Sequence, residues 1–399
     1  MQILSFGCAR YKPFREPVHV ELRPLTLVLG RNNSGKTALV RLPRLLLEAL
    51  APDGREAGFP LEAAGLTFGQ KFQDLINGRQ PNGSVDFEIV CQDGAERLDL
   101  RATVQGIQSF VEPPSVVSRL ECRAAQTRTL EWEPTPEAIG AYKGHGPIAF
   151  RGLLPDARDW GFVDAWRTRA KRLQETIAHL GPLRDEAQPI YVDRGRRALS
   201  QTGDQAAGWL VHDRALELSV GAWFEKHMQG WRLSTQRILD NFSCVMTRAG
   251  IDVNLCDAGQ GAQQVLPVVV QQLAHRGAAS EPFLDIVEQP ELHLHAAAEA
   301  PVADLFVETA KSGAGVVLVE THSENFLLRV RRRIAEGALD AERVAVYWVD
   351  DSDRRGSSVR RIHVDPAGEV DFWPDGVFSE AYEEVKAIRR AARAKGALA

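Results

Sequence analysis

The sequence lacks several features that mark specialised classes of protein. Cysteine is scarce, and its five residues never fall at the spacing of metal ligands, so we expect reduced, buried thiols at Cys8, Cys91, Cys122, Cys244 and Cys256. No stretch approaches the roughly 18–20 consecutive apolar residues of a membrane span. The first residues, Met1–Phe6, read as a strand without the basic and apolar regions of a secretory signal. We therefore expect a cytoplasmic protein with no membrane partner.

A surplus of basic charge is also missing. The chain has 48 lysines and arginines against 53 aspartates and glutamates, which gives a net charge of −5. That balance excludes a basic field over the whole surface, of the kind that attracts nucleic acid. Basic residues gather only locally, around Arg194–Arg197, Arg329–Arg333 and Arg389–Arg393. Each cluster fits either a solvated helix face or a local phosphate contact, and the sequence leaves both interpretations open.

What is present is typical of a globular α/β protein. The 399 residues are 44% hydrophobic and 25% charged, and they leave room for two or three domains of roughly 100–200 residues. Alternating apolar and polar residues predict antiparallel strands between residues 85 and 133. From residue 251 onward, expected strands alternate with expected helices, beginning with a strand over Ile251–Cys256. That alternation predicts a largely parallel sheet covered on both faces.

The segment between these parts is expected to be mostly helical. Apolar residues return every three or four positions in Ala165–Leu180, Ala206–Leu218 and Ala222–Phe242. We therefore predict one α/β core that is split by an insertion. The expected domains are a first core lobe (1–105), an insertion that is first β and then helical (106–250), a second core lobe (251–350), and a hairpin with a basic helical tail (351–399).

One segment matches G-x-x-x-x-G-K-[ST], the phosphate-binding loop or Walker A motif, at every fixed position. It follows the apolar run Leu25–Leu29 and precedes an expected helix over Lys36–Leu50. The glycines let backbone N–H groups turn inward, and the helix N-terminus adds its positive dipole end. Lys36 can reach the β and γ phosphates, and the Thr37 hydroxyl is a ligand for Mg²⁺. The predicted nucleotide-binding residues are Gly30, Arg31, Asn32, Asn33, Ser34, Gly35, Lys36 and Thr37.

Two further apolar strands end in polar groups. The run Phe283–Val287 leads into Glu288, at the place where a Walker B acid holds Mg²⁺. The run Val316–Val319 leads into Glu320–Ser323, where His322 is placed to sense the γ-phosphate. A histidine after a strand is by itself more often a loop or cap residue, but its position after the loop and the acid favours the site. The sequence therefore predicts ATP and Mg²⁺ as cofactors, with Glu288 as the second metal ligand.

These motifs, in this order, resemble the ABC-type ATPase heads of the RecF/SMC/OLD group. The resemblance is closest to the bacterial "AAA family" ATPases that sit in phage-defence or nuclease operons. It is carried by Gly30–Thr37, Asp257–Gly261, Glu288–His295 and Glu320–Ser323, and it covers residues 1–105 and 180–385. The resemblance implies an ABC-type P-loop ATPase head, in which a mixed sheet with flanking helices lies beside an antiparallel β subdomain.

The resemblance also assigns roles by position. The segment Asp257–Gly261 stands where the family has its signature, which caps the γ-phosphate held by a partner subunit, so a homodimer that sandwiches nucleotide is implied. The residues alone indicate only a helix N-cap there. Leu292–His295 is placed at the dimer interface, and the Q-loop glutamine is either Gln70 or Gln73. The implied signature residues are Asp257, Ala258, Gly259, Gln260 and Gly261, and the implied catalytic residues are Glu288, Gln289, Glu291 and His322.

One position departs from the pattern of most ABC heads. They place a glutamate directly after the Walker B acid, whereas this chain has Gln289. An amide cannot accept a proton, although it can orient water. Glu291, two positions on, is a further candidate. We therefore expect slow ATP hydrolysis and a long-lived ATP-bound dimer.

Three functions are compatible with these motifs. The first, which we favour, is an ATPase switch that controls a separate effector, such as a nuclease in a phage-defence or genome-maintenance system. The second is an enzyme with its own nuclease domain, which needs roughly 100 residues and a carboxylate cluster; Asp350–Asp353 reads instead as a solvated hairpin turn. The third is a RecF-like ATPase that acts on DNA directly, with Arg329–Arg333 meeting phosphates unless these arginines pair with Glu336 and nearby acids.

Overall fold

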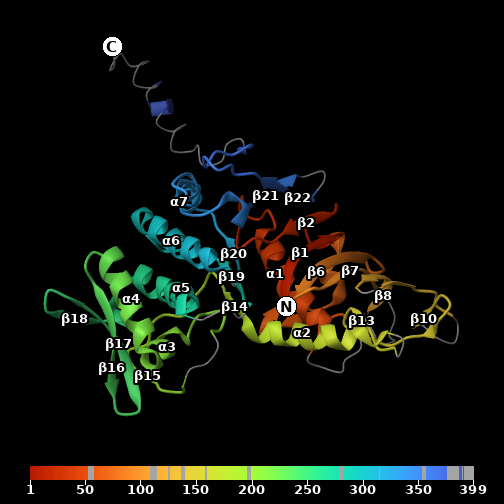
Figure 1. Ribbon diagram of the computed structural model, residues 1–399, viewed down its shortest axis with the longest axis horizontal. Coiled ribbons are helices and arrows are strands. Elements are labelled where there is room, and N and C mark those ends of the chain that lie inside the picture. Colours follow the sequence, from red (N-terminus) through yellow and green to blue (C-terminus); the bar gives the residue numbers. More distant parts are fainter. Residues whose placement is uncertain are drawn as a thin grey trace.

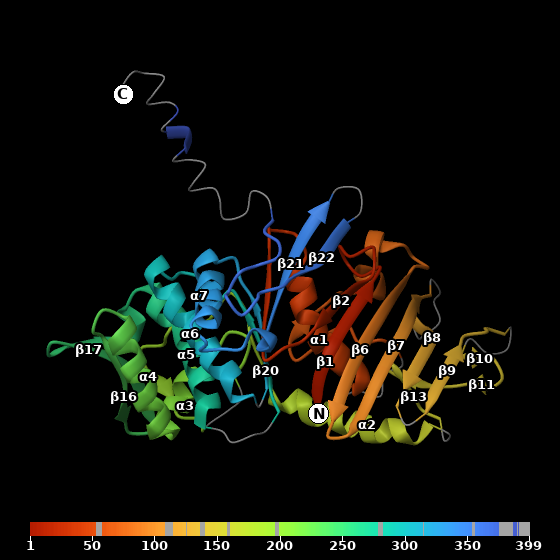
Figure 2. The same cartoon turned by 45° about the horizontal axis from the view of Figure 1, so that its top comes forward.

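Two large sheets and the helices around them build most of the molecule (Figure 1 and Figure 2). The computed structural model describes residues 1–52, 58–107, 115–124, 126–135, 140–157, 160–195, 199–277, 282–313, 315–352, 356–374, 386–388 and 390. Within these ranges no helix is both long and apolar enough to cross a membrane.

The central sheet has six strands, of which the first five run parallel and the last antiparallel. In spatial order they are β14 (Ile177–Leu180), β19 (Leu284–Glu288), β20 (Val316–Glu320), β3 (Leu25–Gly30), β21 (Val344–Ser352) and β22 (Gly356–Ile362). Their runs of valine, leucine and isoleucine suit strands that are buried on both faces. The carboxyl ends of β3, β20 and β19 therefore meet at one edge.

The second large sheet is antiparallel and also has six strands. In order they are β2 (Val18–Glu21), β1 (Gln2–Ala9), β6 (Ser84–Asp93), β7 (Glu96–Gly106), β8 (Ser115–Arg123) and β9 (Thr127–Glu131). Along β6 and β7 buried side chains alternate with more exposed ones, so one face of the sheet packs on the core and the other meets solvent. The expected antiparallel β subdomain is confirmed.

Helix α1 (Lys36–Leu50) lies between the two sheets (Figure 2). Ile286 of β19 and Leu318 of β20 belong to the hydrophobic core around α1, whereas the residues that follow them belong to the core on the opposite face. Because side chains alternate along a strand, Glu288 and Glu320, two residues further on, point toward the α1 side. The alternation thus brings two carboxylates to the start of the helix that leaves the phosphate loop.

The opposite face of the central sheet is covered by α5 (Gln260–Gly277), α6 (Ala296–Ser312) and α7 (Glu324–Ala335). A neighbouring lobe contains α3 (Ala206–His212) and α4 (Arg214–His227). Its small sheet has β15 (Tyr191–Val192), β17 (Asn241–Arg248) and β16 (Arg232–Ile238), and β18 (Ile251–Asn254) also pairs with β17. Helix α2 (Phe162–Thr176) contributes to the core around α1.

The remaining elements are short. Three hairpins pair β4 (Glu62–Ala63) with β5 (Leu66–Thr67), β10 (Ala141–Tyr142) with β11 (Gly146–Pro147), and β12 (Phe150–Arg151) with β13 (Leu154–Pro155). Single 3₁₀ turns are η1 (Phe72–Leu75), η2 (Asn77–Arg79), η4 (Leu255–Asp257) and η5 (Ala341–Arg343).

The helix expected over Ala222–Phe242 is wrong in its second half. Helix α4 ends at His227, and β16 and β17 then form a hairpin after a turn in which Gln229 and Gly230 have positive φ. The helix-like spacing of apolar residues continues across this turn, so periodicity alone misses it. Tertiary contacts decide the outcome, because Thr235 of β16 donates its backbone N–H (2.6 Å) and its hydroxyl (2.7 Å) to the buried Glu217 of α4.

Two more expectations for the middle of the chain are wrong. The helix expected over Ala165–Leu180 ends at Thr176, and residues 177–180 form β14 at the edge of the central sheet. The strand expected over Ile251–Cys256 is β18, but it pairs with β17 instead of joining the parallel sheet. A short apolar run does not reveal its partner.

The four expected domain bounds remain a prediction, and strands from within 106–250 lie in both large sheets. Asp350 and Asp351 lie on β21 opposite Ser358 and Ser357 of β22, which confirms a hairpin there. Its turn, 353–355, and most of the basic tail after residue 374 lie outside the described residues.

Candidate nucleotide-binding site

The phosphate loop joins β3 to α1 and takes its shape from two glycines at positive φ, Gly30 (155°) and Gly35 (97°). A Cβ atom on Gly30 would lie 2.2 Å from the backbone oxygen of Val349, and one on Gly35 would lie 2.6 Å from Cγ of Pro13. Only glycine fits at these two points. Helix α1 starts at Lys36, as the sequence predicts, so its free N–H groups face the loop.

Lys36 and Thr37 project from the first turn of α1 into the site. Lys36 is buried, and its Nζ donates to the backbone oxygen of Arg31. Burial lowers the pKa of Lys36, against the opposing effect of the Glu320 charge. The Thr37 hydroxyl donates to Oε1 of Glu320 over 3.0 Å. Both side chains therefore lie beside the loop that is predicted to bind phosphate.

Glu288, the predicted Walker B acid, is 1% exposed, and both of its carboxylate oxygens accept hydrogen bonds. Arg41 of α1 forms a two-pronged ion pair with it, with Nε 2.6 Å from Oε1 and an Nη atom 2.8 Å from Oε2. Nε2 of His179, on β14, lies 2.7 Å from Oε1. Burial opposes ionisation of Glu288, but the hydrogen bonds from His179 and Arg41 prevail and lower its pKa. Glu288 is therefore an ionised carboxylate in which both oxygens accept hydrogen bonds.

Glu320, at the end of β20, is the second carboxylate of the site. It stands opposite Glu288 in the parallel pairing of β19 and β20 and is 2% exposed. Its Oε1 accepts the Thr37 bond, while its Oε2 is buried and has no hydrogen-bond partner in the described part of the chain. Burial and the charge of Glu288 raise the pKa of Glu320, although Thr37, Lys36 and Arg41 act the other way.

Hydrogen bonds join the segment that follows β19 to the end of β20 and the segment that follows it. Gln289 has a left-handed backbone (φ 46°), and its N–H donates to the backbone oxygen of Glu320 over 2.7 Å. Oε1 of Glu291 accepts the backbone N–H of His322 over 2.7 Å, and burial raises the pKa of Glu291. Burial and the Lys36 charge lower the pKa of His322 to about 4, so its imidazole is neutral at neutral pH. The four expected catalytic residues thus lie together, and their catalytic roles remain a prediction.

The predicted signature residues lie on a different surface. Asp257 ends η4, and Gln260 and Gly261 open α5. A Cβ atom on Gly259 would meet no atom within 4 Å, whereas one on Gly261 would lie 2.9 Å from the backbone oxygen of His293. This segment lines a cavity of about 550 Å³ together with His293–His295 and Trp231. No residue of the phosphate loop lines that cavity, which is the arrangement expected if the signature serves another chain.

Arg184 joins the signature helix to the Walker B strand. It is 5% exposed, and its guanidinium donates to the backbone oxygens of Glu288 (2.8 Å), Gln289 (3.3 Å) and Gln264 (3.3 Å). The Gln264 side chain, on α5, returns a bond to the Arg184 backbone oxygen over 2.8 Å. Burial lowers the pKa of Arg184 to about 10, so it stays charged at neutral pH. Arg184 thus connects α5 to the end of β19 through hydrogen bonds.

Two buried polar atoms indicate that the site fits a Mg²⁺-nucleotide. Oε2 of Glu320 and Oγ of Ser34 are buried without hydrogen-bond partners among the described residues. A carboxylate, the Thr37 hydroxyl and a loop of inward N–H groups are the donor set that such a ligand takes, because Mg²⁺ usually binds one or two protein oxygens besides phosphate and water. Gln70, one alternative for the Q-loop, precedes η1, and Gln73, the other, is its second residue; no contact with the site assigns either of them.

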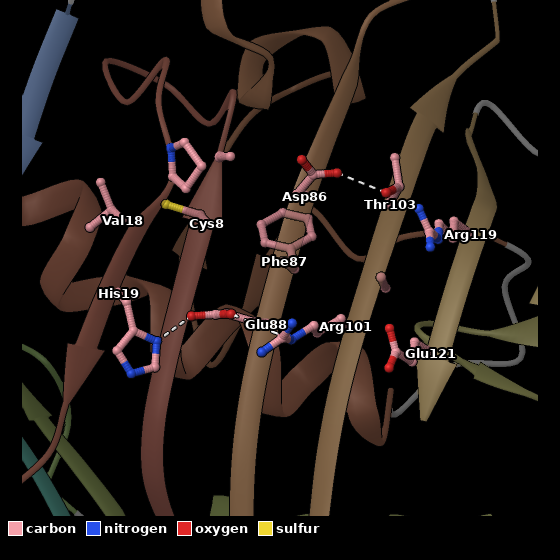
Figure 3. A pocket seen from close by; sticks show the side chains of 13 residues that line it. Cys8, Val18, His19, Asp86, Phe87, Glu88, Arg101, Thr103, Arg119 and Glu121 are labelled. Carbon is pink, nitrogen blue, oxygen red and sulfur yellow. Dashed lines mark hydrogen bonds and ion pairs between the residues drawn. The ribbon is translucent and has the colours of Figure 1, made fainter. Parts of the chain in front are cut away.

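Two other surface features lie away from this site. A hollow of about 570 Å³ opens on the solvent face of the antiparallel sheet, where His19 contacts Glu88 and Asp86 accepts from Thr103 (Figure 3). It shares no residue with the phosphate loop. The arginines of α7 proposed as phosphate contacts all pair with acids: Arg329 and Arg333 with Asp304, Arg331 with Glu369, and Arg332 with Glu336. These ion pairs favour the solvated-face interpretation.

Comparisons with known proteins agree with this geometry. A family model described as "AAA domain, putative AbiEii toxin, Type IV TA system" matches residues 25–329, which is most of the chain. The chain belongs to this family. A second family model, "Protein of unknown function (DUF3696)", matches residues 339–388 of this AAA-domain protein. The chain is also 22% identical over 414 residues to the OLD nuclease of Thermus scotoductus, a match that takes in 99% of this chain and 71% of the nuclease. The expected resemblance to the RecF/SMC/OLD group is thereby confirmed.

Solved structures with a similar backbone include two SMC heads. The SMC head domain from Thermotoga maritima has a TM-score of 0.47 and 11% identity, over 90% of this chain and 98% of that one. The Smc head domain with an extended coiled coil, bound to the C-terminal domain of ScpA and derived from Pyrococcus furiosus, has a TM-score of 0.42 and 12% identity, over 97% and 99%. Both scores lie below 0.5, so the assignment of an ABC-type P-loop ATPase rests on the sheets, the motifs and the family.

Four residues of the site carry no role in the sequence reasoning: Arg41, His179, Arg184 and Glu320. Arg41 had a usable signal, because it follows Thr37 by one helical turn and so lies on the same side of the helix. His179 interrupts a short apolar run, and Glu320 ends one, in the manner of a strand-end functional residue. Arg184 had no signal of its own, since its partners are backbone oxygens from distant segments.

Proposed function

We propose that the protein is an ATP-binding and slowly ATP-hydrolysing switch that dimerises around nucleotide and controls a separate effector, a nuclease. The observation that carries the nucleotide part is the convergence of the loop, Lys36, Thr37, two buried carboxylates and a neutral His322 at one sheet edge. Membership of an AAA-domain family supports it.

The chain's own groups would divide the work as follows. The loop N–H groups and Lys36 hold the phosphates, and Thr37 with a strand-end carboxylate holds the Mg²⁺. The metal, when bound, withdraws charge from the β and γ phosphate oxygens. Gln289 orients the attacking water without taking its proton. With no glutamate at that position, we infer that hydrolysis is slow.

Dimerisation would complete the site. The open space beside Gly259 can receive a phosphate held by a second chain, because the free N–H groups at the start of α5 attract an anion. Arg184 would then carry the state of the signature helix to the backbone of Glu288 and Gln289. In this scheme the buried guanidinium of Arg184 links nucleotide binding to the geometry of the dimer.

A mixing experiment tests the shared site. Lys36→Ala removes the lysine contact to phosphate from the loop of the chain that carries it. Gly259→Asp adds a negative charge to the signature segment, in a space that is open in the single chain. Each variant alone should have only defective sites. A one-to-one mixture should regain ATP turnover, since one mixed site combines an intact loop with an intact signature. If the mixture is no more active than the average of its components, the shared-site proposal is wrong.

The effector part rests on the family description, which names a toxin, and on the similarity to an OLD nuclease. A nuclease encoded beside this protein should bind the wild-type chain in the presence of Mg·ATP and should bind Lys36→Ala poorly. DNA affinity that requires ATP and falls steeply with salt, in the absence of any such nuclease, would instead support direct action on DNA.

A further inference from the structure

The two strand-end carboxylates are not equivalent in their surroundings. Glu288 is held by three donors, two from Arg41 and one from His179, and both of its oxygens are engaged. Glu320 has one donor, the Thr37 hydroxyl, and its Oε2 is buried with no partner among the described residues. A buried carboxylate oxygen without a donor is costly, so it marks a place where a cation or donor is expected.

We infer that Glu320, and not Glu288, supplies the carboxylate that faces Mg²⁺, and that Glu288 is a positioning residue held by Arg41 and His179. This inference rests on the proposed function, because the ion would come with its nucleotide.

The position of Thr37 decides between the two carboxylates. Thr37 is the residue of the phosphate loop expected to ligate Mg²⁺, and its hydroxyl lies 3.0 Å from Glu320 Oε1. Glu320 lies on β20, the strand directly beside β3, whereas Glu288 lies one strand further away on β19. An ion bound by Thr37 therefore reaches Glu320 first.

The Arg41 pair argues further against Glu288. If Glu288 ligated the ion through an oxygen that Arg41 now occupies, the guanidinium would lose its partner in a site that is largely buried. Ligation through Glu320 needs no such break, since Oε2 is already bare and the Thr37 proton can turn away from Oε1. Arg41 and His179 would then keep Glu288 in place as a fixed negative charge beside the metal.

Mn²⁺ can replace Mg²⁺ as a probe, because free Mn²⁺ gives an electron paramagnetic resonance signal that is lost on binding. The experiment titrates Mn²⁺ into the full chain with a non-hydrolysable ATP analogue, and it compares the wild type with Glu320→Gln, Glu320→Asp and Glu288→Gln. Nucleotide affinity in EDTA and a thermal melt show whether each variant is folded and keeps its loop.

We expect Glu320→Gln to weaken Mn²⁺ binding by about tenfold or more, and Glu288→Gln, which removes a nearby charge but no ligand, to weaken it by a clearly smaller factor. Glu320→Asp, which keeps the carboxylate, should recover part of the loss. Metal-free nucleotide affinity should stay within about twofold for all three variants.

Three results would overturn the inference. A larger loss of Mn²⁺ affinity in Glu288→Gln than in Glu320→Gln would show that Glu288 supplies the carboxylate that faces the metal. Equal losses of Mn²⁺ affinity would show that the two carboxylates share the metal. If the wild type itself binds neither the analogue nor Mn²⁺ with it, the proposed function fails, and this inference fails with it.

Discussion

Gly30 and Gly259 belong to the two nucleotide motifs but are glycines for different reasons, and alanine substitutions separate them. A Cβ atom on Gly30 would lie 2.2 Å from the backbone oxygen of Val349 and 2.9 Å from Oγ of Ser34. A Cβ atom on Gly259 would meet nothing within 4 Å. The fold of the single chain therefore requires glycine at position 30, whereas it has space for a side chain at position 259.

The size of the Gly30→Ala effect follows from two contributions. A carbon atom normally stays beyond about 3.3 Å from a carbonyl oxygen, so the loop or β21 must move by about 1 Å, and overpacking of this kind costs roughly 1–3 kcal/mol. The φ of 155° adds strain for a residue with a side chain, of roughly 1–3 kcal/mol. We expect Gly30→Ala to lower the free energy of unfolding by about 2–6 kcal/mol and to abolish ATP binding.

Gly259→Ala is the matched control for this substitution. It should leave the free energy of unfolding within about 0.5 kcal/mol of the wild type, because the methyl group points into open space. Urea unfolding followed by tryptophan fluorescence, with ATP affinity by calorimetry, measures both variants. Wild-type stability and ATP affinity in Gly30→Ala would refute the loop geometry. A loss in Gly259→Ala as large as that in Gly30→Ala would refute the description of the signature as open.

Three further predictions concern the site and its support. Gln289→Glu should raise steady-state ATP turnover by at least about tenfold, because it restores a general base; equal or lower turnover would refute slow hydrolysis by the wild type. Arg184→Met should lower the free energy of unfolding by about 3 kcal/mol through loss of bonds from a buried charged donor, whereas the exposed Arg332→Met should change it by less than about 0.5 kcal/mol in the same urea titration. Burial lowers the pKa of His275, but the charge and hydrogen bond of Asp285 prevail and raise it above 6.5. The ion pair between the two residues therefore stabilises the fold below pH 6.5. This stabilisation is lost as the pH rises through the pKa of His275 in the folded protein. The stability difference between wild type and His275→Gln should therefore shrink as the pH rises above about 6.5, and a difference that stays constant with pH would contradict it.

The sequence predicts those parts of the site whose residues lie close together along the chain. The phosphate loop and α1 are predicted to the residue, because a glycine pattern, a strand before it and a helix after it lie within one short segment. Glu288 and His322 are predicted for the same reason, since each lies just after a short apolar run, whereas no role is predicted for Glu320, which ends the second run. The roles of these residues in catalysis stay predictions.

What the sequence does not reveal depends on distant partners. The segment 177–180 looks like the end of a helix and becomes a strand because β19 offers an open edge. The stretch 232–248 becomes a hairpin because Glu217 of α4 accepts hydrogen bonds from Thr235. In the site, the preference of Arg41 for Glu288 and of Thr37 for Glu320 is set by which strand lies next to which. No local pattern encodes that order.

The most direct test of the nucleotide switch is the mass of the protein in solution, measured by light scattering with and without Mg·ATP, on the wild type and on Lys36→Ala. We predict that Mg·ATP doubles the mass of the wild type and leaves that of Lys36→Ala unchanged, because the variant cannot hold the phosphates that join two chains. If Lys36→Ala binds ATP and assembles as the wild type does, the proposed nucleotide-driven dimer is contradicted.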